Sequence, residues 1–101
     1  HCRLGEWRVI RSYADRATEE VANGHAPRRI PADVLARARR KLRQINSAAT
    51  IEDLRNPPGN RLEALSADRA GQHSIRVNDQ WRICFRWLGG DAFDVEIVDY
   101  H

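Results

Sequence analysis

The sequence of 101 residues contains no long apolar segment. None of its hydrophobic runs approaches the roughly 20 residues that a membrane-spanning helix requires. Its first residues also lack the pattern of a signal peptide. Hydrophobic residues make up 42% and charged residues 31%, which is the composition of a globular protein. We therefore expect one domain with a modest core, located in the cytoplasm and not associated with a membrane.

Cysteine is scarce and methionine is absent. Cys2 lies at one end and Cys84 lies in an apolar strand pattern, so we expect two free thiols rather than a disulfide framework. No CxxC or HxxxH spacing occurs, so we expect neither a metal site nor a cofactor. Residues 1–8 have no clear periodicity, and we interpret them as an extension, a processed start or an expression remnant. The domain is expected to span residues 9–101.

Lysine is almost missing, because Lys41 is the single lysine among 17 basic residues. The net charge is only +3, but the charges are unevenly distributed. Thirteen basic and seven acidic residues precede Leu62, whereas four basic and seven acidic residues are found from Leu62 onward. Arginine offers a planar fork of donors that suits phosphates. This predicts a phosphate-bearing partner, although an acidic protein partner fits the charge equally well.

Two helices are predicted in the first half of the chain. Ser12 and Asp15 have a spacing related to the capping box and predict a short helix over residues 13–22, after an extended segment at residues 9–12. A stronger helix is predicted over residues 31–45, with Pro31 at its first position and Asp33 in its first turn. Its apolar stripe consists of Val34, Leu35, Ala38, Leu42 and Ile45. A helical turn over residues 51–55 and a Pro-Pro-Gly loop follow.

The second half is predicted to form an antiparallel meander of strands over residues 62–65, 72–77 and 81–88 and a last strand that contains residues 93–97. The third of these strands alternates most clearly, since large apolar residues at every second position are separated by Arg82, Cys84 and Arg86. The apolar side is predicted to contain Trp81, Ile83, Phe85, Trp87, Phe93, Val95 and Ile97. Helices followed by a meander predict an α+β fold in which the helices cover this apolar side.

The opposite face of the sheet is then predicted to display Arg76, Arg82 and Arg86 side by side, close to Arg61 and Glu63. Such a face can bind phosphates. Cleavage of RNA requires few special groups, because the ribose 2′-OH can attack its own 3′ phosphate while an enzyme stabilises the charge and moves two protons. Arginine can stabilise the charge, and histidine or a carboxylate can move the protons without a metal.

The chain ends in Asp99, Tyr100 and His101, which are candidates for this proton transfer and for stacking on a base. A frayed, inactive terminus is the alternative, and His25 and His73 are weaker candidates. Strict alternation places Asp99 and His101 on the helix side of the sheet and Tyr100 on the arginine side, unless the chain leaves the sheet before Asp99.

Four blocks of the sequence, in this order, resemble the HigB toxins, also called plasmid maintenance system killer proteins. The blocks are PPGNRLEAL (57–65), DRAGQHSIRV (68–77), NDQWRICF (78–85) and VEIVDYH (95–101), and residues 9–12 are similar to the usual start of that family. The resemblance implies a RelE-like fold, in which two helices pack on one side of a small curved antiparallel sheet. It also implies cleavage of mRNA in the A site of the 70S ribosome, and a HigA-type helix-turn-helix antitoxin. Operator DNA would be bound only through the antitoxin complex.

The resemblance also implies roles for individual residues. Arg82 matches the arginine that stabilises the transition state, and Asp99, Tyr100 and His101 match the terminal active-site motif. Some members have histidine where this chain has Glu63 and lysine where it has Ser66, so Glu63 is an alternative base, one that the neighbouring Arg61 disfavours. Contacts with RNA or the ribosome are expected from Arg61, Arg69, Arg76, Arg86, Arg40 and Arg43.

Other interpretations remain open at this point. The basic face of the second helix is either a solvated surface or a contact with RNA or antitoxin. Because of Glu63 and Ser66, the chain can also be a non-catalytic binding module that acts as a co-repressor with its antitoxin. A third possibility is an unrelated small RNA-binding domain. The sequence predicts neither a codon preference nor the stoichiometry of a complex.

Overall fold

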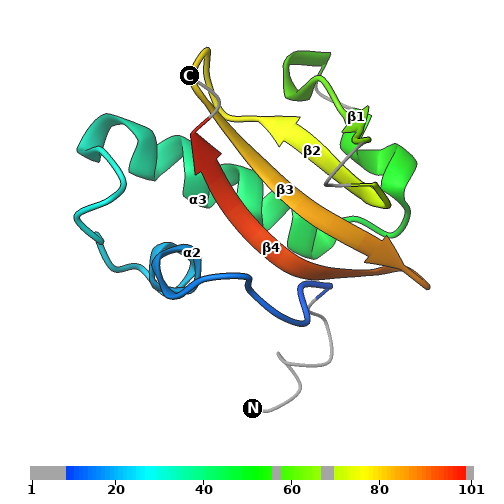
Figure 1. Ribbon diagram of the computed structural model, residues 1–101, viewed down its shortest axis with the longest axis horizontal. Coiled ribbons are helices and arrows are strands. Elements are labelled where there is room, and N and C mark those ends of the chain that lie inside the picture. The colour runs from blue at the N-terminus through cyan, green and yellow to red at the C-terminus, as the bar shows by residue number, and fades with distance from the viewer. Residues whose placement is uncertain (1–8, 56–57, 67–69, 100–101) are drawn as a thin grey trace.

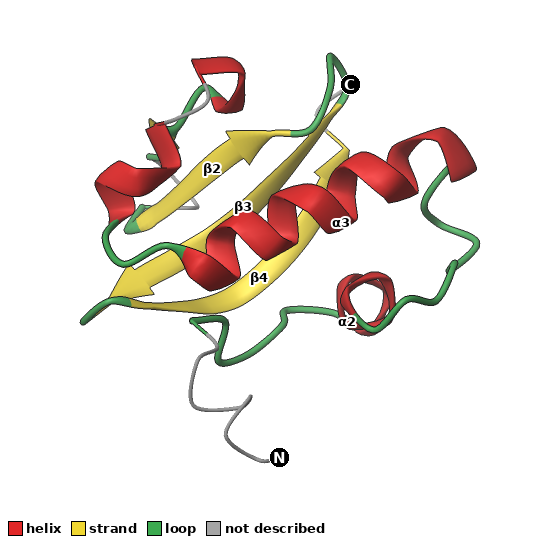
Figure 2. Cartoon of the chain, turned by 180° about the vertical axis from the view of Figure 1, so that it is seen from behind, coloured by secondary structure: helices red, strands yellow, loops and turns green. Residues whose placement is uncertain are grey.

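The computed structural model describes residues 9–55, 58–66 and 70–99. Its four-stranded antiparallel sheet consists of β1 (Glu63–Ala64), β2 (Gln72–Arg76), β3 (Trp81–Leu88) and β4 (Asp91–Asp99), which lie side by side in that order. Two helices pack on one face of this sheet (Figure 1, Figure 2). The predicted α+β fold is confirmed. Within the described ranges, no helix has both the length and the apolar composition needed to cross a bilayer.

Helix α2 (Arg16–Ala22) begins three residues later than predicted because a different residue caps it. The carboxylate of Asp15 accepts a hydrogen bond from the Thr18 amide at 2.9 Å and so satisfies one of the unpaired N–H groups of the first turn. Ser12, the predicted cap, instead accepts a hydrogen bond from the Asp94 amide at 2.9 Å. The prediction for Ser12 was therefore wrong, since this residue lies along strand β4.

Helix α3 (Ala32–Ser47) crosses the sheet and supplies most of the helical half of the core (Figure 2). Pro31 precedes the first helical turn instead of occupying it, and the helix continues two residues beyond the predicted end at Ile45. The predicted apolar stripe is confirmed, with Leu35 as its only half-buried member. The buried members are Val34, Ala38, Leu42 and Ile45.

Two short 3-10 helices, η1 (Ile51–Arg55) and η2 (Pro58–Asn60), connect α3 to the sheet. The predicted turn over residues 51–55 is thus confirmed. The Asp53 carboxylate accepts the amides of Ala49 and Thr50 at 2.8 and 3.1 Å, which satisfies backbone groups at the start of η1. These turns bring the chain to the edge of the sheet where β1 begins.

The register of the strands assigns one face of the sheet to the core. Ile75, Ile83 and Ile97 lie opposite one another on β2, β3 and β4, and each is fully buried. Phe85, on the same face of β3, makes an edge-to-face contact with Trp87 at a centroid distance of 6.3 Å. The alternation predicted for β3 is therefore confirmed. Cys84, on the other face, is fully buried.

An irregularity in β4 changes which of its residues face the core. Cys84 pairs with Glu96 but Arg86 pairs with Phe93, so β4 contains one extra residue at this point. Asp94 absorbs the extra residue with a φ of 54°, in the left-handed region. The bulge turns Phe93 to the face that bears Arg86, and Ala92 occupies the core instead. The prediction that Phe93 joins the apolar side was wrong for this reason.

The N-terminal segment runs parallel to the outer edge of β4. Ile10 bridges Ala92 and Tyr13 bridges Val95. Arg11 N and Ala14 N donate to carbonyls of β4 at 2.7 and 2.9 Å, and β4 amides donate back to Val9 and Ser12 at 2.9 and 3.1 Å. The extended start predicted for residues 9–12 is confirmed, and the segment covers an edge that would otherwise expose unpaired backbone groups.

Candidate functional site

The face of the sheet opposite the helices bears a hollow of about 410 Å³ near the start of β3. Residues from β1, β2, β3 and the β2–β3 turn surround it together with the residue that follows η2, and three of the six are arginines. The hollow, here called the arginine hollow, is lined by Arg61, Glu63, Arg76, Asn78, Asp79 and Arg82. Four of the predicted site residues are thereby brought together from segments that span 22 positions of the sequence, 61 to 82.

Arg82 is the most constrained side chain of the hollow, and only 11% of it is exposed. Its Nε donates to the Ser74 hydroxyl at 2.8 Å, and one terminal nitrogen donates to the Arg61 carbonyl at 2.7 Å. The same nitrogen lies 3.4 Å from the Glu63 carboxylate, which is 59% exposed. Hydrogen bonds that involve a charged donor are stronger than neutral ones. The guanidinium plane is therefore oriented before any ligand arrives.

The backbone that accepts the Arg82 hydrogen bond is itself in an unusual conformation. Arg61 has a φ of 46°, which is uncommon for a residue other than glycine. The preceding residue, Asn60, is fully buried, and its amide nitrogen donates to the Gln44 side chain at 3.0 Å and to the Leu54 carbonyl at 3.1 Å. Lys41 donates to its side-chain oxygen. Asn60 thus anchors η2 to α3 and holds the left-handed residue in place.

Lys41 links the basic residues of α3 to the edge of the hollow. Burial, and then the positive charges of Arg40, Arg37 and Arg76, lower the pKa of Lys41 below its ordinary value of 10.5. Arg76 of β2 therefore contributes to the electrostatic potential at Lys41 of α3. An anion that approaches this edge of the sheet is attracted by charges from both layers.

The turn between β2 and β3 forms one wall of the hollow. The Asn78 side chain accepts hydrogen bonds from the amides of Gln80 and Trp81, both at 2.8 Å, which closes the hairpin locally. Arg76 forms an ion pair with Asp79 in this turn, but Asp79 is 98% exposed and its charge is well solvated. The pair therefore adds little stability and leaves Arg76 able to exchange its partner for another anion.

Asp99 ends strand β4 beside the β2–β3 turn. It pairs in register with Trp81, and its carboxylate accepts a hydrogen bond from the Gln80 side chain at 3.0 Å. The chain thus stays in the sheet through Asp99. This residue therefore lies on the helix side of the sheet with Trp81, as strict alternation predicted, whereas Val98 lies opposite Arg82 on the other face. Tyr100 and His101, which complete the predicted terminal motif, lie outside the described residues, as does Arg69.

The remaining predicted contacts lie away from the hollow. Arg86 is on the same face but four residues further along β3, within 3.9 Å of Asp94. Arg40 and Arg43 belong to α3, in the other layer, and His25 follows the end of α2. His73 lies opposite Phe85, with a ring-centroid distance of 6.4 Å. It therefore belongs to the core side and not to the arginine side.

Sequence reasoning missed two residues that prepare the hollow. Ser74 was placed on the correct face by alternation, and its position beside arginines was a usable signal for a positioning role. Asn60 gave no such signal, because its function depends on contacts with α3 that alternation and spacing do not reveal. Among the described residues, no group of three or more His, Cys, Asp or Glu side chains is arranged to hold a metal ion.

The chemistry of this arrangement is the recognition of an anion. A preorganised guanidinium with flanking arginines matches the oxygens of a phosphate group and stabilises additional negative charge that develops on it. A small antiparallel sheet with two helices on one face and an arginine hollow on the other is consistent with the RelE-like fold that the sequence resemblance implied. The comparisons with known proteins assign the chain more closely.

Residues 11–101 match the family model described as RelE-like toxin of type II toxin–antitoxin system HigB, and the chain belongs to this family. The chain is 43% identical over 67 residues to Toxin HigB-1 of Vibrio cholerae, which covers 66% of this chain and 70% of that protein. It is 31% identical over 93 residues to Endoribonuclease HigB of Proteus vulgaris, which covers 92% of this chain and 100% of that protein. As a member of a type II family, the chain is the toxin of a toxin–antitoxin pair.

Proposed function

We propose that this toxin is a ribosome-dependent endoribonuclease that cleaves mRNA in the A site and thereby stops translation. Family membership and the name of the Proteus vulgaris relative support an activity on RNA. The observation that carries the proposal is the geometry of Arg82, whose side chain is oriented by Ser74 and by the Arg61 carbonyl at the wall of the arginine hollow.

The proposed reaction is an internal transesterification that needs no metal. The 2′ oxygen of a ribose forms a bond with the adjacent phosphorus while the bond from phosphorus to the 5′ oxygen breaks. A base removes the 2′ proton, and an acid gives a proton to the leaving 5′ oxygen. The products are a 2′,3′-cyclic phosphate and a 5′ hydroxyl. Arg82 stabilises the charge on the pentacovalent phosphorane, and Arg61 and Arg76 bind neighbouring phosphates.

Proton transfer is proposed for the end of the chain. His101 and Asp99 share the acid and base roles, and Tyr100 orients the nucleotide by stacking or hydrogen bonding. Asp99 lies at the end of β4, where its carboxylate accepts a hydrogen bond from Gln80 on the opposite face of the sheet from Arg82, so this assignment rests on the resemblance of the terminal motif. Glu63, 3.4 Å from Arg82, is the alternative base. Arg69 and Arg86 are proposed as further contacts with RNA or the ribosome.

The proposed partners follow from the same family. A HigA-type helix-turn-helix antitoxin neutralises the toxin, and the complex binds operator DNA through the antitoxin. The place of action is the cytoplasm, where the 70S ribosome presents the mRNA. The ribosome orients the message, so the toxin itself needs only a small set of catalytic groups.

The test adds purified, antitoxin-free toxin to mRNA on programmed ribosomes and maps the new RNA ends by primer extension. Arg82→Ala and a deletion of His101 are measured beside the unchanged protein. We expect a discrete cut in the A-site codon, which requires ribosomes and is lost in both variants. A cut that survives both changes would contradict the assigned residues and would move proton transfer to Glu63.

One observation favours a non-catalytic binding module as the second candidate. The Glu63 carboxylate lies beside the guanidinium that would stabilise the phosphorane, and it competes with a phosphate for that cation. In this case the protein acts with its antitoxin as a co-repressor. A folded toxin that cuts none of several messages, but forms an operator-binding complex, would support this function and refute the first.

A further inference from the structure

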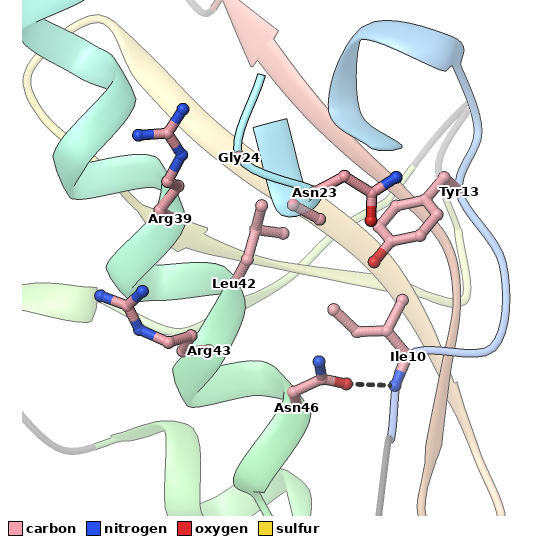
Figure 3. A pocket seen from close by; sticks show the side chains of 9 residues that line it. Ile10, Tyr13, Asn23, Gly24, Arg39, Leu42, Arg43 and Asn46 are labelled. Carbon is pink, nitrogen blue, oxygen red and sulfur yellow. Dashed lines mark hydrogen bonds between the residues drawn. The ribbon is translucent and has the colours of Figure 1, made fainter. Parts of the chain in front are cut away.

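A second concave site lies on the helix side of the molecule. It has a volume of about 270 Å³ and is formed between α2, α3 and the N-terminal segment that pairs with β4. Arg39, Leu42, Arg43 and Asn46 of α3 lie along one side, and Ile10 and Tyr13 face them from the N-terminal segment (Figure 3). We call it the helix-side pocket. None of the residues of the arginine hollow belongs to it.

The floor of the helix-side pocket is apolar. Ile10 and Leu42 line it and are themselves only 6% and 3% exposed, so both are held rigidly in the core. Ala22, the last residue of α2, lines it as well and is exposed. A floor of this kind gains free energy when it covers an aliphatic or short apolar group.

The rim of the pocket is basic and rich in donors. Arg39 uses its guanidinium to hold the carbonyls of Val21 and His25 at 3.2 and 2.9 Å. The guanidinium of the exposed Arg43, in contrast, forms no ion pair or hydrogen bond with any of the described residues. No acidic residue is found among the nine described residues that line the pocket.

Asn46 adds a polar group with a defined orientation. Its side-chain oxygen accepts hydrogen bonds from the amides of Val9 and Ile10 at 3.1 and 2.9 Å (Figure 3). Because the oxygen of the Asn46 amide faces Val9 and Ile10, its NH₂ group points away from them. No described residue accepts a hydrogen bond from this group. The pocket therefore combines an uncommitted cation, an uncommitted pair of N–H donors and an apolar floor. That set complements a carboxylate attached to a short apolar stem.

The size of the pocket indicates what carries the carboxylate. Ligand sites for whole small molecules usually measure about 300–1,000 Å³. The helix-side pocket falls below that range and is suited to one or two side chains of a larger partner. Single-stranded RNA is bound by series of aromatic stacking platforms and rows of cations, whereas Tyr13 is the one aromatic residue among the nine described residues that line this pocket. We infer that the helix-side pocket docks an acidic segment of the antitoxin, with an Asp or Glu side chain on Arg43 and Asn46.

The inference rests on the proposed function only in that its partner is the antitoxin. The experiment measures the affinity of the antitoxin encoded in the same operon for the full-length toxin by titration calorimetry. Arg43→Glu reverses the rim charge, and Ala22→Trp fills the apolar part of the pocket. The matched controls are Arg37→Glu and Ala36→Trp, which place the same changes on exposed positions of α3 outside the pocket.

Both pocket variants are expected to weaken antitoxin binding by about tenfold or more, and both controls by less than about threefold. Replacing one Asp or Glu of the antitoxin with arginine is expected to restore its binding to the Arg43→Glu toxin. An unfolded toxin variant could not be rescued in this way. Thermal unfolding identifies variants that do not fold, and Arg43→Ala then replaces Arg43→Glu.

Two results would overturn the inference. One is wild-type antitoxin affinity in both folded pocket variants. The other is ribosome binding that weakens in Arg43→Glu while antitoxin affinity is unchanged, which would make the pocket an RNA contact. Ala22→Trp is expected to cleave mRNA like the unchanged toxin. A toxin that never cleaves mRNA but loses antitoxin binding in both pocket variants would refute the proposed function and retain the pocket.

Discussion

Replacing Ser74 with alanine tests whether a buried side chain positions Arg82 for its proposed role. Ser74 is fully buried, and its hydroxyl accepts the Nε hydrogen bond of Arg82 at 2.8 Å. A hydrogen bond to a charged group contributes about 1.5–3 kcal/mol. Arg82 keeps its bond to the Arg61 carbonyl at 2.7 Å, so we expect the lower part of this range. That corresponds to a decrease of about tenfold in kcat/KM.

The assay is single-turnover cleavage of mRNA on programmed ribosomes, combined with urea unfolding. Because Ser74 positions Arg82, we expect the decrease in kcat and not in ribosome affinity, and a loss of about 1.5 kcal/mol in the free energy of unfolding. In an Arg82→Ala background, the serine change should have no further effect on the rate. Ser47→Ala, at the exposed end of α3, is the control. A wild-type rate for Ser74→Ala would refute the positioning role.

Three further changes test the site and the elements that support it. Glu63→Gln removes the carboxylate 3.4 Å from Arg82, and we expect RNA to bind about twofold to fivefold more tightly in a filter assay, whereas a hundredfold fall in cleavage would identify Glu63 as the base. Asp15→Ala removes both the cap of α2 and the ion pair with Arg29 and should cost about 1–2 kcal/mol in urea unfolding, whereas Asp15→Asn, which can still cap the helix, should lose less. Asp94→Gly should raise the free energy of unfolding by up to about 1 kcal/mol because glycine adopts the φ of 54° without strain, and a decrease would contradict the account of the bulge.

Much of the fold follows from periodicity. The strand Trp81–Leu88 has the predicted bounds, and helix α3 has the predicted apolar stripe, because in both elements the buried face repeats with the period of the backbone. Prediction failed where tertiary contacts decide. Asp15 caps α2 because Ser12 is engaged by β4, and Phe93 leaves the core because of a bulge at a residue that is not glycine. Neither event alters the local pattern of the sequence.

The candidate site was also predicted where it follows from alternation along the strands and missed where it depends on contacts between elements. Alternation placed Arg76 and Arg82 on one face, and their convergence with Glu63 follows from the order of the strands. The Arg61 carbonyl could not be predicted as a partner of Arg82. Its direction depends on the left-handed backbone of Arg61, which the buried Asn60 stabilises through its hydrogen bonds with side chains of α3. The spacing of residues along a strand indicates neighbours on a face, but it carries no information about carbonyl groups from a loop.

The pairing of the N-terminal segment with β4 has a consequence for the order in which the fold forms. The amide of Arg11 bonds to the carbonyl of Ala92, and the amide of Ala14 to that of Val95, so each bond joins positions that lie 81 residues apart in the sequence. Contacts of such large sequence separation form late, because a long loop must be closed first. A chain that lacks β4 therefore has no partner for the N-terminal segment and lacks the strand next to Arg82. We expect the N-terminal segment to join the sheet only after β4 has paired with β3.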